Sequence, residues 1–258
     1  MAIVLTLAQQ KGGAGKTTLA ANLAAAWAPR RRVALLDIDP QRSLARWHAL
    51  RAARAGTAPV ALSVVSGWRL AAELDRLRRD HDVLIVDSPP QIDTDARLAV
   101  RAAGLVLVPL QPSPPDLWAA EGTLALAAAE RRPARLVFNR APATGKLRAE
   151  VAAAAQQQGL PLLAATLGNR AGIAAAFARG LGITETAPKS VAAAELLALH
   201  REVFRMTAVF LAVVFGPWRA MRAAPSPQAV DRIRRLVQVN LLLGALTLIV
   251  AAFAAPGG

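Results

Sequence analysis

Residues 10–18 read QKGGAGKTT, and this stretch decides the fold. It follows an apolar run at 3–8 and precedes a helical pattern at 17–27. An apolar strand, a glycine-rich turn and a helix in this order are typical of a phosphate-binding loop. The glycines allow backbone N–H groups to close around phosphate oxygens, and the helix N-terminus adds its positive dipole end. The stretch therefore predicts a nucleotide site in which Lys16 reaches the β- and γ-phosphates and the Thr17 hydroxyl holds Mg²⁺.

The loop departs from the usual G-x-x-x-x-G-K-[ST] pattern at its entrance. Gln10 stands where that pattern has a glycine, and an additional lysine, Lys11, precedes the glycine pair. A second lysine at this position suits a phosphate contact from a neighbouring subunit, whereas the alternative is an accidental lysine beside a turn. The residues expected to surround the phosphates are Gly12, Gly13, Ala14, Gly15, Lys16, Thr17 and Thr18.

Apolar runs bounded by turn residues alternate with helical patterns along the chain. This alternation predicts an α/β fold with a mostly parallel, doubly wound sheet and helices on both faces. The strands read as continuous Val, Leu and Ile runs, as expected where both faces of a sheet are covered. The expected strands are 3–8, 33–37, 60–65, 83–87, 104–109 and 134–138, with a weaker one at 160–167. The expected helices are 17–27, 43–54, 67–79, 95–102, 117–131, 146–158, 171–179 and 190–205.

Polar residues follow several of the expected strands. Asp37, Asp39, Asp87 and Asn139 all lie at or just after a strand end. Ligand sites in parallel sheets lie at the carboxyl ends of the strands, so motifs and topology predict the same site. Structural alternatives stay open: the two acids at 37 and 39 can cap the helix at 43–54, and Asn139 can be a turn residue.

Four further segments resemble motifs of the ParA/MinD family of dimerising partition ATPases, which are P-loop NTPases with a deviant Walker A loop. They are LLDIDPQ at 35–41, VLIVDSPP at 83–90, VLVPLQPSPPDLW at 106–118 and VFNR at 137–140. The segments occur in the family's order and together are highly specific, whereas any one of them alone would be weak. The resemblance covers about residues 1–205.

The resemblance implies ATP as the nucleotide, Mg²⁺ as its metal, and slow, partner-stimulated hydrolysis to ADP and phosphate. It implies a homodimer that forms on ATP binding, in which Lys11 crosses the interface as an arginine finger does in trans. It assigns the attacking water to Asp39 and the adenine base to Asn139. The implied catalytic residues are Lys11, Lys16 and Asp39, and the implied Mg²⁺ residues are Thr17, Asp37 and Asp87.

The chain carries a large excess of positive charge. Its formal net charge is +14 and its pI is about 11.7, and residues 1–205 alone hold 26 basic and 16 acidic side chains, a net charge of +10. Such a field favours nucleic acid or anionic lipid, although a GC-rich genome produces a similar composition. We expect sequence-blind binding to the DNA backbone. The candidate DNA-binding residues, taken from the family's use of C-terminal helices, are Arg170, Arg179, Lys189 and Arg201.

The composition excludes several classes of site. There are no cysteines, which removes disulfides, thiolate catalysis and iron–sulfur clusters. The three histidines are scattered without metal-ligand spacing. The N-terminus opens directly into a strand, so no secretory signal is expected, and a nucleotide site this early favours the cytoplasm.

Residues 206–258 differ in character from the preceding body. The run at 236–255 has no charge and is long enough to cross a hydrocarbon core of ~30 Å. The linker at 219–235 carries five arginines and one acid, and positive charge belongs on the cytoplasmic side. We therefore expect one span, with 206–218 in the interface or against the body. A two-span hairpin and a packed or spurious extension are the alternatives.

Three functions stay open on the sequence alone. The first is a dimerising partition or positioning ATPase, nucleoid-associated, that moves DNA or a protein cargo and is stimulated by a small adaptor or ParB-like protein. The second is a MinD-like spatial regulator anchored at the inner face of the membrane through 236–255. The third is a metabolic enzyme of the same superfamily, which Lys11 and the D-x-D-P-Q motif disfavour.

Overall fold

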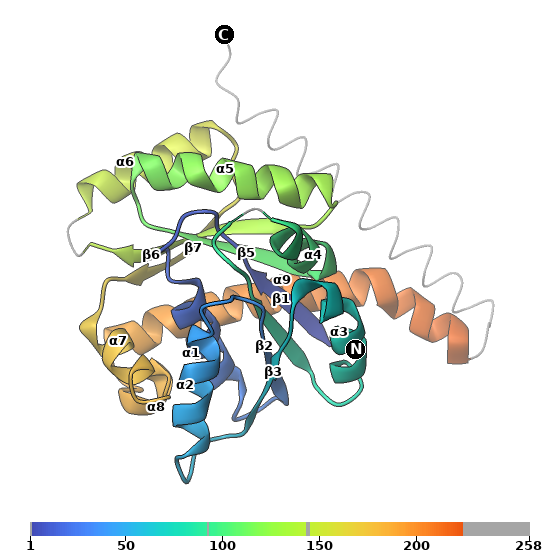
Figure 1. Cartoon of the computed structure of the whole chain (residues 1–258). Helices are drawn as coiled ribbons and strands as arrows, with labels where there is room; N and C mark the ends of the chain where they lie inside the picture. The colour runs from blue at the N-terminus through green and yellow to red at the C-terminus, as the bar shows by residue number, and fades with distance from the viewer. Residues whose placement is uncertain (1, 92, 143–144, 224–258) are drawn as a thin grey trace. The chain divides into compact units, whose positions relative to one another are not determined.

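The computed structural model describes residues 2–91, 93–142 and 145–223, with the backbone alone for 208–223. Seven strands form one sheet in the order β3-β2-β4-β1-β5-β6-β7, and all neighbouring strands are parallel (Figure 1). The predicted parallel α/β sheet is confirmed, including its weaker seventh strand. The strands are β1 (Ile3–Leu7), β2 (Val33–Asp37), β3 (Val60–Val64), β4 (Val83–Asp87), β5 (Leu105–Leu110), β6 (Ala134–Ala141) and β7 (Leu162–Gly168).

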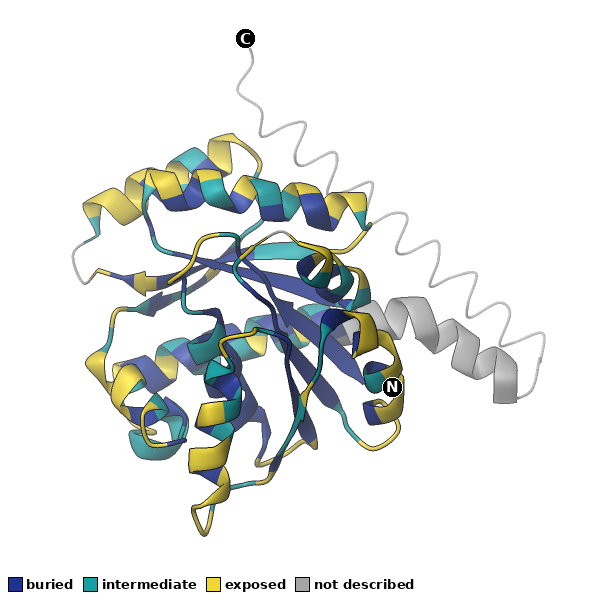
Figure 2. Cartoon of the chain, in the orientation of Figure 1, coloured by how far each residue is buried: buried dark blue, intermediate teal, exposed yellow. Residues whose placement is uncertain are grey.

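Helices connect the strands and cover both faces of the sheet. The helices α3 to α6 pack on one face, in two apolar clusters centred on β2, β4 and β1 and on β5 and β6. The other face is covered by α1, against which α7 and α8 pack. Figure 2 shows the strands as the most continuously buried part of the molecule. The helices are α1 (Lys16–Trp27), α2 (Ser43–Ala52), η1 (Gly67–Arg69, a 3-10 helix), α3 (Leu70–Leu77), α4 (Thr94–Ala102), α5 (Pro114–Ala129), α6 (Lys146–Gln157), α7 (Ala171–Phe177), α8 (Ile183–Thr186) and α9 (Val191–Ala223).

The register of the sheet brings the ends of the central strands to one level. Asp87 pairs with Leu7 on one side and with Asp37 on the other. The glycine-rich loop leaves β1 at this level. It is therefore flanked by the acidic ends of β4 and β2 on one side and by β5 and β6 on the other.

Some helix bounds differ from those expected. α5 begins at Pro114 rather than at 117, because the Ser113 side chain accepts the N–H of Asp116 and two prolines occupy the first turn. The expected helix at 67–79 is divided into η1 and α3. The expected last helix, 190–205, continues as α9 to Ala223.

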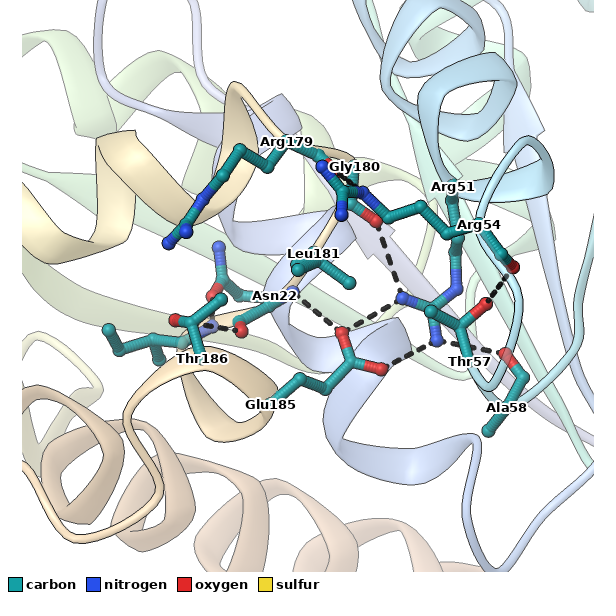
Figure 3. A network of polar contacts seen from close by, with 12 residues as sticks. Asn22, Arg51, Arg54, Thr57, Ala58, Arg179, Gly180, Leu181, Glu185 and Thr186 are labelled. Atoms are coloured by element: carbon teal, nitrogen blue, oxygen red, sulfur yellow. Dashed lines mark hydrogen bonds and ion pairs between the residues drawn. The ribbon is translucent and has the colours of Figure 1, made fainter.

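A largely buried ion pair joins the end of α2 to α8, and further hydrogen bonds join it to the connection between α7 and α8. The two terminal nitrogens of Arg51 donate to the two carboxylate oxygens of Glu185 at 2.9 and 2.7 Å, and also to the carbonyls of Gly180 and Ala58 (Figure 3). Trp47, one turn earlier, donates to a carbonyl of the same connection at 3.3 Å. These contacts hold the C-terminal end of α2. The N-terminal end of α2 lies beside Asp37, one of the acidic residues next to the glycine-rich loop.

Residue contacts divide the chain into two compact units, Met1–Glu202 and Val203–Gly258. Within the described part of the chain, no helix is both long enough and apolar enough to cross a membrane. The expected span at 236–255 and most of the basic linker before it lie outside the described residues and stay predictions.

Candidate nucleotide-binding site

The glycine-rich loop requires glycine at two of its positions. Gly13 has φ of +80° and Gly15 has φ of +87°, in the left-handed region that residues with a side chain rarely adopt. A Cβ atom at Gly15 would also collide with the side-chain amide of Asn139. No described side chain caps the N-terminus of α1, so its first N–H groups remain available for an anion. The backbone therefore offers donors where the sequence predicts a phosphate site.

Lys16 begins α1 and lies beneath the loop, nearly buried. Its Nζ donates to the carbonyl of Gln9 at 3.1 Å. Burial lowers the pKa of Lys16, and the carboxylates of Asp87 and Asp39 act in the opposite direction. Because its acceptor is a neutral carbonyl, the ammonium can exchange this hydrogen bond for a stronger one to a phosphate oxygen.

Asp87, the last residue of β4, has a fully buried carboxylate beside Lys16 and Thr17. Neither of its oxygens has a hydrogen-bond partner among the described residues. Burial raises the pKa of Asp87 to about 7, while the nearby Thr17 hydroxyl and the Lys16 ammonium oppose the rise. A buried acid without a partner is costly, and a hydrated cation supplies what is missing. Asp87 and Thr17 therefore fit Mg²⁺, which keeps several waters and uses one or two carboxylates together with phosphates.

Within the described ranges, no three acidic or histidine side chains come close enough to hold a metal ion by themselves. Asp37 is buried and both of its oxygens are already used, one by the N–H of Asp39 at 3.1 Å and the other by that of Ala45 at 2.9 Å. Its contacts hold the loop after β2 and the first turn of α2. Asp39, only partly buried, accepts the N–H of Gln41 at 2.9 Å through one carboxylate oxygen.

Lys11 is bound within its own chain in this structure. Its Nζ lies 2.6 Å from a carboxylate oxygen of Asp116, whose side chain is 3% exposed. The same carboxylate accepts the Ser113 hydroxyl at 2.6 Å, so the first turn of α5 holds the acid in place. Sequence reasoning missed Asp116 as a site residue, although it lies in the proline-rich segment at 106–118. The expected contact of Lys11 with a second copy stays a prediction.

The end of β6 fastens the glycine-rich loop from the side opposite the acids. Asn139 Nδ2 donates to the carbonyl of Ala14 at 2.7 Å, and Arg140 Nη1 donates to the carbonyl of Gly13 at 3.0 Å. Asn139 is thus next to the loop, as expected, but its amide nitrogen is used by the protein itself. Arg140 was also missed, and its only signal in the sequence is its place directly after Asn139.

The candidate DNA-binding residues differ in their surroundings. Arg170 forms an ion pair with Glu195 at 2.6 Å, which offsets its charge. Arg179, which follows α7, is exposed, and Nε of Arg54 donates to its carbonyl at 2.6 Å (Figure 3). The structure therefore adds Arg54 beside Arg179. Lys189 and Arg201 are exposed.

A family profile described as the CobQ/CobB/MinD/ParA nucleotide binding domain matches residues 5–183. This chain belongs to that family. It is 29% identical over 201 residues to the maintenance of carboxysome distribution protein A of Halothiobacillus neapolitanus, which covers 75% of this chain and 92% of that protein. It is 35% identical over 131 residues to protein ParA of Rhizobium radiobacter, which covers 49% of this chain and 57% of that protein.

Its fold is also that of a solved MinD structure. The septum site-determining protein MinD of Pyrococcus horikoshii, complexed with Mg-ADP, superimposes with a TM-score of 0.64 at 20% identity, over 81% of this chain and 98% of that one. The ParA/MinD resemblance read from the sequence is confirmed. The glycine-rich loop and the buried acid at the end of β4 are thus parts of the nucleotide-binding domain of a ParA/MinD-type ATPase family.

Proposed function

We propose that this chain is an ATP-dependent, dimerising ATPase that partitions or positions a DNA or protein cargo. The observation that carries the proposal is the fully buried carboxylate of Asp87 at the end of β4. Among the described residues neither of its oxygens forms a hydrogen bond of good geometry, and the Thr17 hydroxyl and the Lys16 ammonium, both in the uncapped first turn of α1, lie nearby. A nucleotide with its metal offsets the cost of that buried acid. The positioning role is supported by relatives whose names refer to carboxysome distribution and to ParA.

Transfer of a phosphoryl group to water depends on positioning the reactants and on neutralising the charge of the phosphate oxygens. The N–H groups of residues 13–18 and the Lys16 ammonium bind the phosphates. Thr17 and, through water, Asp87 would hold Mg²⁺, whose charge would offset that of the phosphate oxygens. Asp39 would orient the attacking water through its carboxylate, and Asp37 holds the backbone that carries Asp39.

In this proposal Lys11 makes the cycle of ATP binding and hydrolysis depend on a second copy of the chain. While it is bound to Asp116 it does not serve a nucleotide. On ATP binding we expect Lys11 to leave Asp116 and reach the phosphates in the other copy of the dimer. A small adaptor of the ParB type would then stimulate hydrolysis and separate the copies.

The test separates binding from turnover. Lys16→Ala is expected to abolish retention of ATP, because the buried ammonium at the phosphates is lost. Asp39→Ala is expected to keep ATP bound and to lower steady-state turnover by about 100-fold, because the water is no longer oriented. Filter binding of labelled ATP and phosphate release measure the two effects. Asp80→Ala, at an exposed position, is the matched control, and parental turnover by Asp39→Ala would contradict the assignment.

Non-specific DNA is the proposed partner of the basic surface at Arg54 and Arg179. Replacing both with Ala is expected to weaken ATP-dependent binding to duplex DNA about equally for unrelated sequences. It is also expected to lower the salt dependence by roughly two counterions, since each contact to a phosphate releases about one. Arg170→Ala, which removes an arginine already paired with Glu195, should change little. Fluorescence anisotropy between ~50 and ~200 mM salt measures how the DNA affinity of the parent and of each variant depends on salt concentration. A sequence preference, or equal binding with ADP, would contradict the proposal.

A membrane-anchored MinD-like regulator is the second candidate function, favoured by the uncharged run at 236–255. Recovery of the full-length protein in the membrane fraction, and loss of that recovery on removing residues 206–258, would support it. Recovery without detergent in the supernatant would dismiss it.

A further inference from the structure

Gln9 is a buried polar residue at the entrance of the glycine-rich loop, beside the end of β5. It lies two residues after β1, and only 2% of its surface is exposed. The chain is still part of the sheet at this point, because the N–H of the preceding Ala8 donates to the carbonyl of Leu107 in β5 at 3.1 Å. A buried amide is costly unless its polar atoms are used, so its partners indicate what the side chain does.

The Gln9 side chain joins the loop to β5. Its Oε1 accepts the N–H of Gln10 at 2.8 Å, and its Nε2 donates to the carbonyl of Pro109 at 3.4 Å. The first contact settles which end of the amide is oxygen, because a backbone N–H can only donate. The second contact reaches a strand 100 residues further along the chain. The side chain therefore connects the loop entrance to the last part of β5.

The main chain of Gln9 holds Lys16. Its carbonyl accepts the Lys16 ammonium at 3.1 Å, and a phosphate oxygen would take that ammonium away. The carbonyl of Gln9 and the N–H of Gln10 belong to one planar peptide group, so they turn together. Because that N–H is bound to Gln9 Oε1, a change at the carbonyl is passed to the side chain.

The end of β5 leads directly to the partner of Lys11. Two residues after Pro109, the N–H of Gln111 donates to one carboxylate oxygen of Asp116 at 3.4 Å. The other oxygen of Asp116 binds the Lys11 ammonium at 2.6 Å. A continuous set of contacts thus links the ammonium groups of the two loop lysines.

We infer that Gln9 is a positioning residue through which phosphate binding by Lys16 weakens the pairing of Lys11 with Asp116. When Lys16 leaves the carbonyl, the peptide group after Gln9 turns, and the amide bound to it shifts the end of β5 that carries the Asp116 segment. The inference rests on the proposed ATP-dependent dimer and adds to it the contacts by which ATP releases Lys11. Without the Gln9 amide, a bound phosphate would leave Lys11 in its pair.

The experiment measures ATP-dependent dimerisation with and without the amide. Gln9→Met keeps the length of the side chain and removes both of its hydrogen bonds. It is expected to raise the dissociation constant of the dimer formed with a non-hydrolysable ATP analogue about tenfold, because two hydrogen bonds are lost. Binding of Mg²⁺-ADP to the single chain should stay within about threefold of the parent. Sedimentation velocity measures the dimer and isothermal titration calorimetry measures ADP binding, both on the full chain.

A second background separates this coupling from support of the fold. In Asp116→Asn the lysine at 11 has lost its charged partner, so Gln9→Met should change the dissociation constant of that dimer by less than about twofold. A side chain that only supported the loop would weaken the dimer equally in both backgrounds. Gln9→Asn guards against a variant that does not fold. It retains an oxygen near the next N–H but is one carbon too short for Pro109, and it should also weaken the dimer only where Asp116 is present.

Gln157→Met, at an exposed position at the end of α6, is the matched control and should bind ADP and dimerise as the parent does. Equal weakening in the two backgrounds, or no weakening by either change at Gln9, would overturn the coupling and leave the proposed function standing. A parent chain that forms no dimer with the analogue would instead contradict the proposed function, and this inference with it.

Discussion

At the scale of single residues, Asp87 links the site to the stability of the protein. Burial raises its pKa to about 7 from an ordinary value near 4. Between those pH values the folded protein holds a proton on Asp87 that the unfolded chain has lost. The contribution of Asp87 to the free energy of unfolding therefore falls as the pH rises from about 4 to about 7, and it is constant above pH 7. We expect nucleotide-free Asp87→Asn to melt at a higher temperature than the parent at pH 8 and at nearly the same temperature at pH 4, by calorimetry.

Asp80→Asn, at an exposed position, should leave the melting temperature unchanged at both pH values. With Mg²⁺ and ATP present at pH 8 the order of stabilities should reverse, because the parent gains the ligand's binding free energy and the variant does not. A variant less stable than the parent without ligand at pH 8 would show that the Asp87 carboxylate has a partner in the folded protein.

At the scale of elements, α2 is held at both ends by contacts that its own sequence does not reveal. Asp37 accepts the N–H of Ala45 at its start, and Arg51 is paired with Glu185 near its end. Arg51→Met removes the cation from a nearly buried pair and leaves the acid uncompensated. We expect a loss of about 3 kcal/mol in the free energy of unfolding, measured by denaturant titration.

The control on the same helix is Arg46→Met, at an exposed position, which should cost less than about 0.5 kcal/mol. Glu185→Gln combined with Arg51→Met should cost clearly less than the two single changes added together, because the unpaired charge is gone. Additive losses would mean that Arg51 acts through packing against Trp47 rather than through its charge.

At the scale of the whole molecule, the position of Lys11 predicts a change of partner during the ATP cycle. In the single chain it is bound to Asp116. Lys11→Ala is therefore expected to leave ATP binding by the monomer largely intact and to abolish the ATP-dependent dimer, because the positive charge that would enter the second copy is missing. Sedimentation velocity in the Asp39→Ala background, where turnover is slow, measures the dimer.

Lys146→Ala, an exposed lysine at the start of α6, should dimerise as the parent does. If Lys11→Ala also dimerises with ATP, the lysine serves only its own chain, and its role is to neutralise the buried carboxylate of Asp116. In that case the melting temperature of the variant should fall with or without nucleotide.

The sequence by itself determined the features that local spacing encodes. The apolar run at 3–8, the glycines at 12, 13 and 15 and the helix after them specify the loop, because a strand end, a left-handed turn and a helix start each need particular residue types in sequence. Continuous Val, Leu and Ile runs predicted a sheet covered on both faces, and Asp87 was recognised because it ends one of those runs.

Only the tertiary structure decided which distant residues meet at the loop. Asp116 lies 105 residues from Lys11, and Arg140 lies 127 residues from Gly13. Nothing in the sequence distinguishes Arg51 from the many other arginines, because its role depends on which helix end the connection between α7 and α8 approaches. Spacing along the chain carries local structure, whereas a contact between strands far apart in sequence is fixed by the packing of the whole sheet.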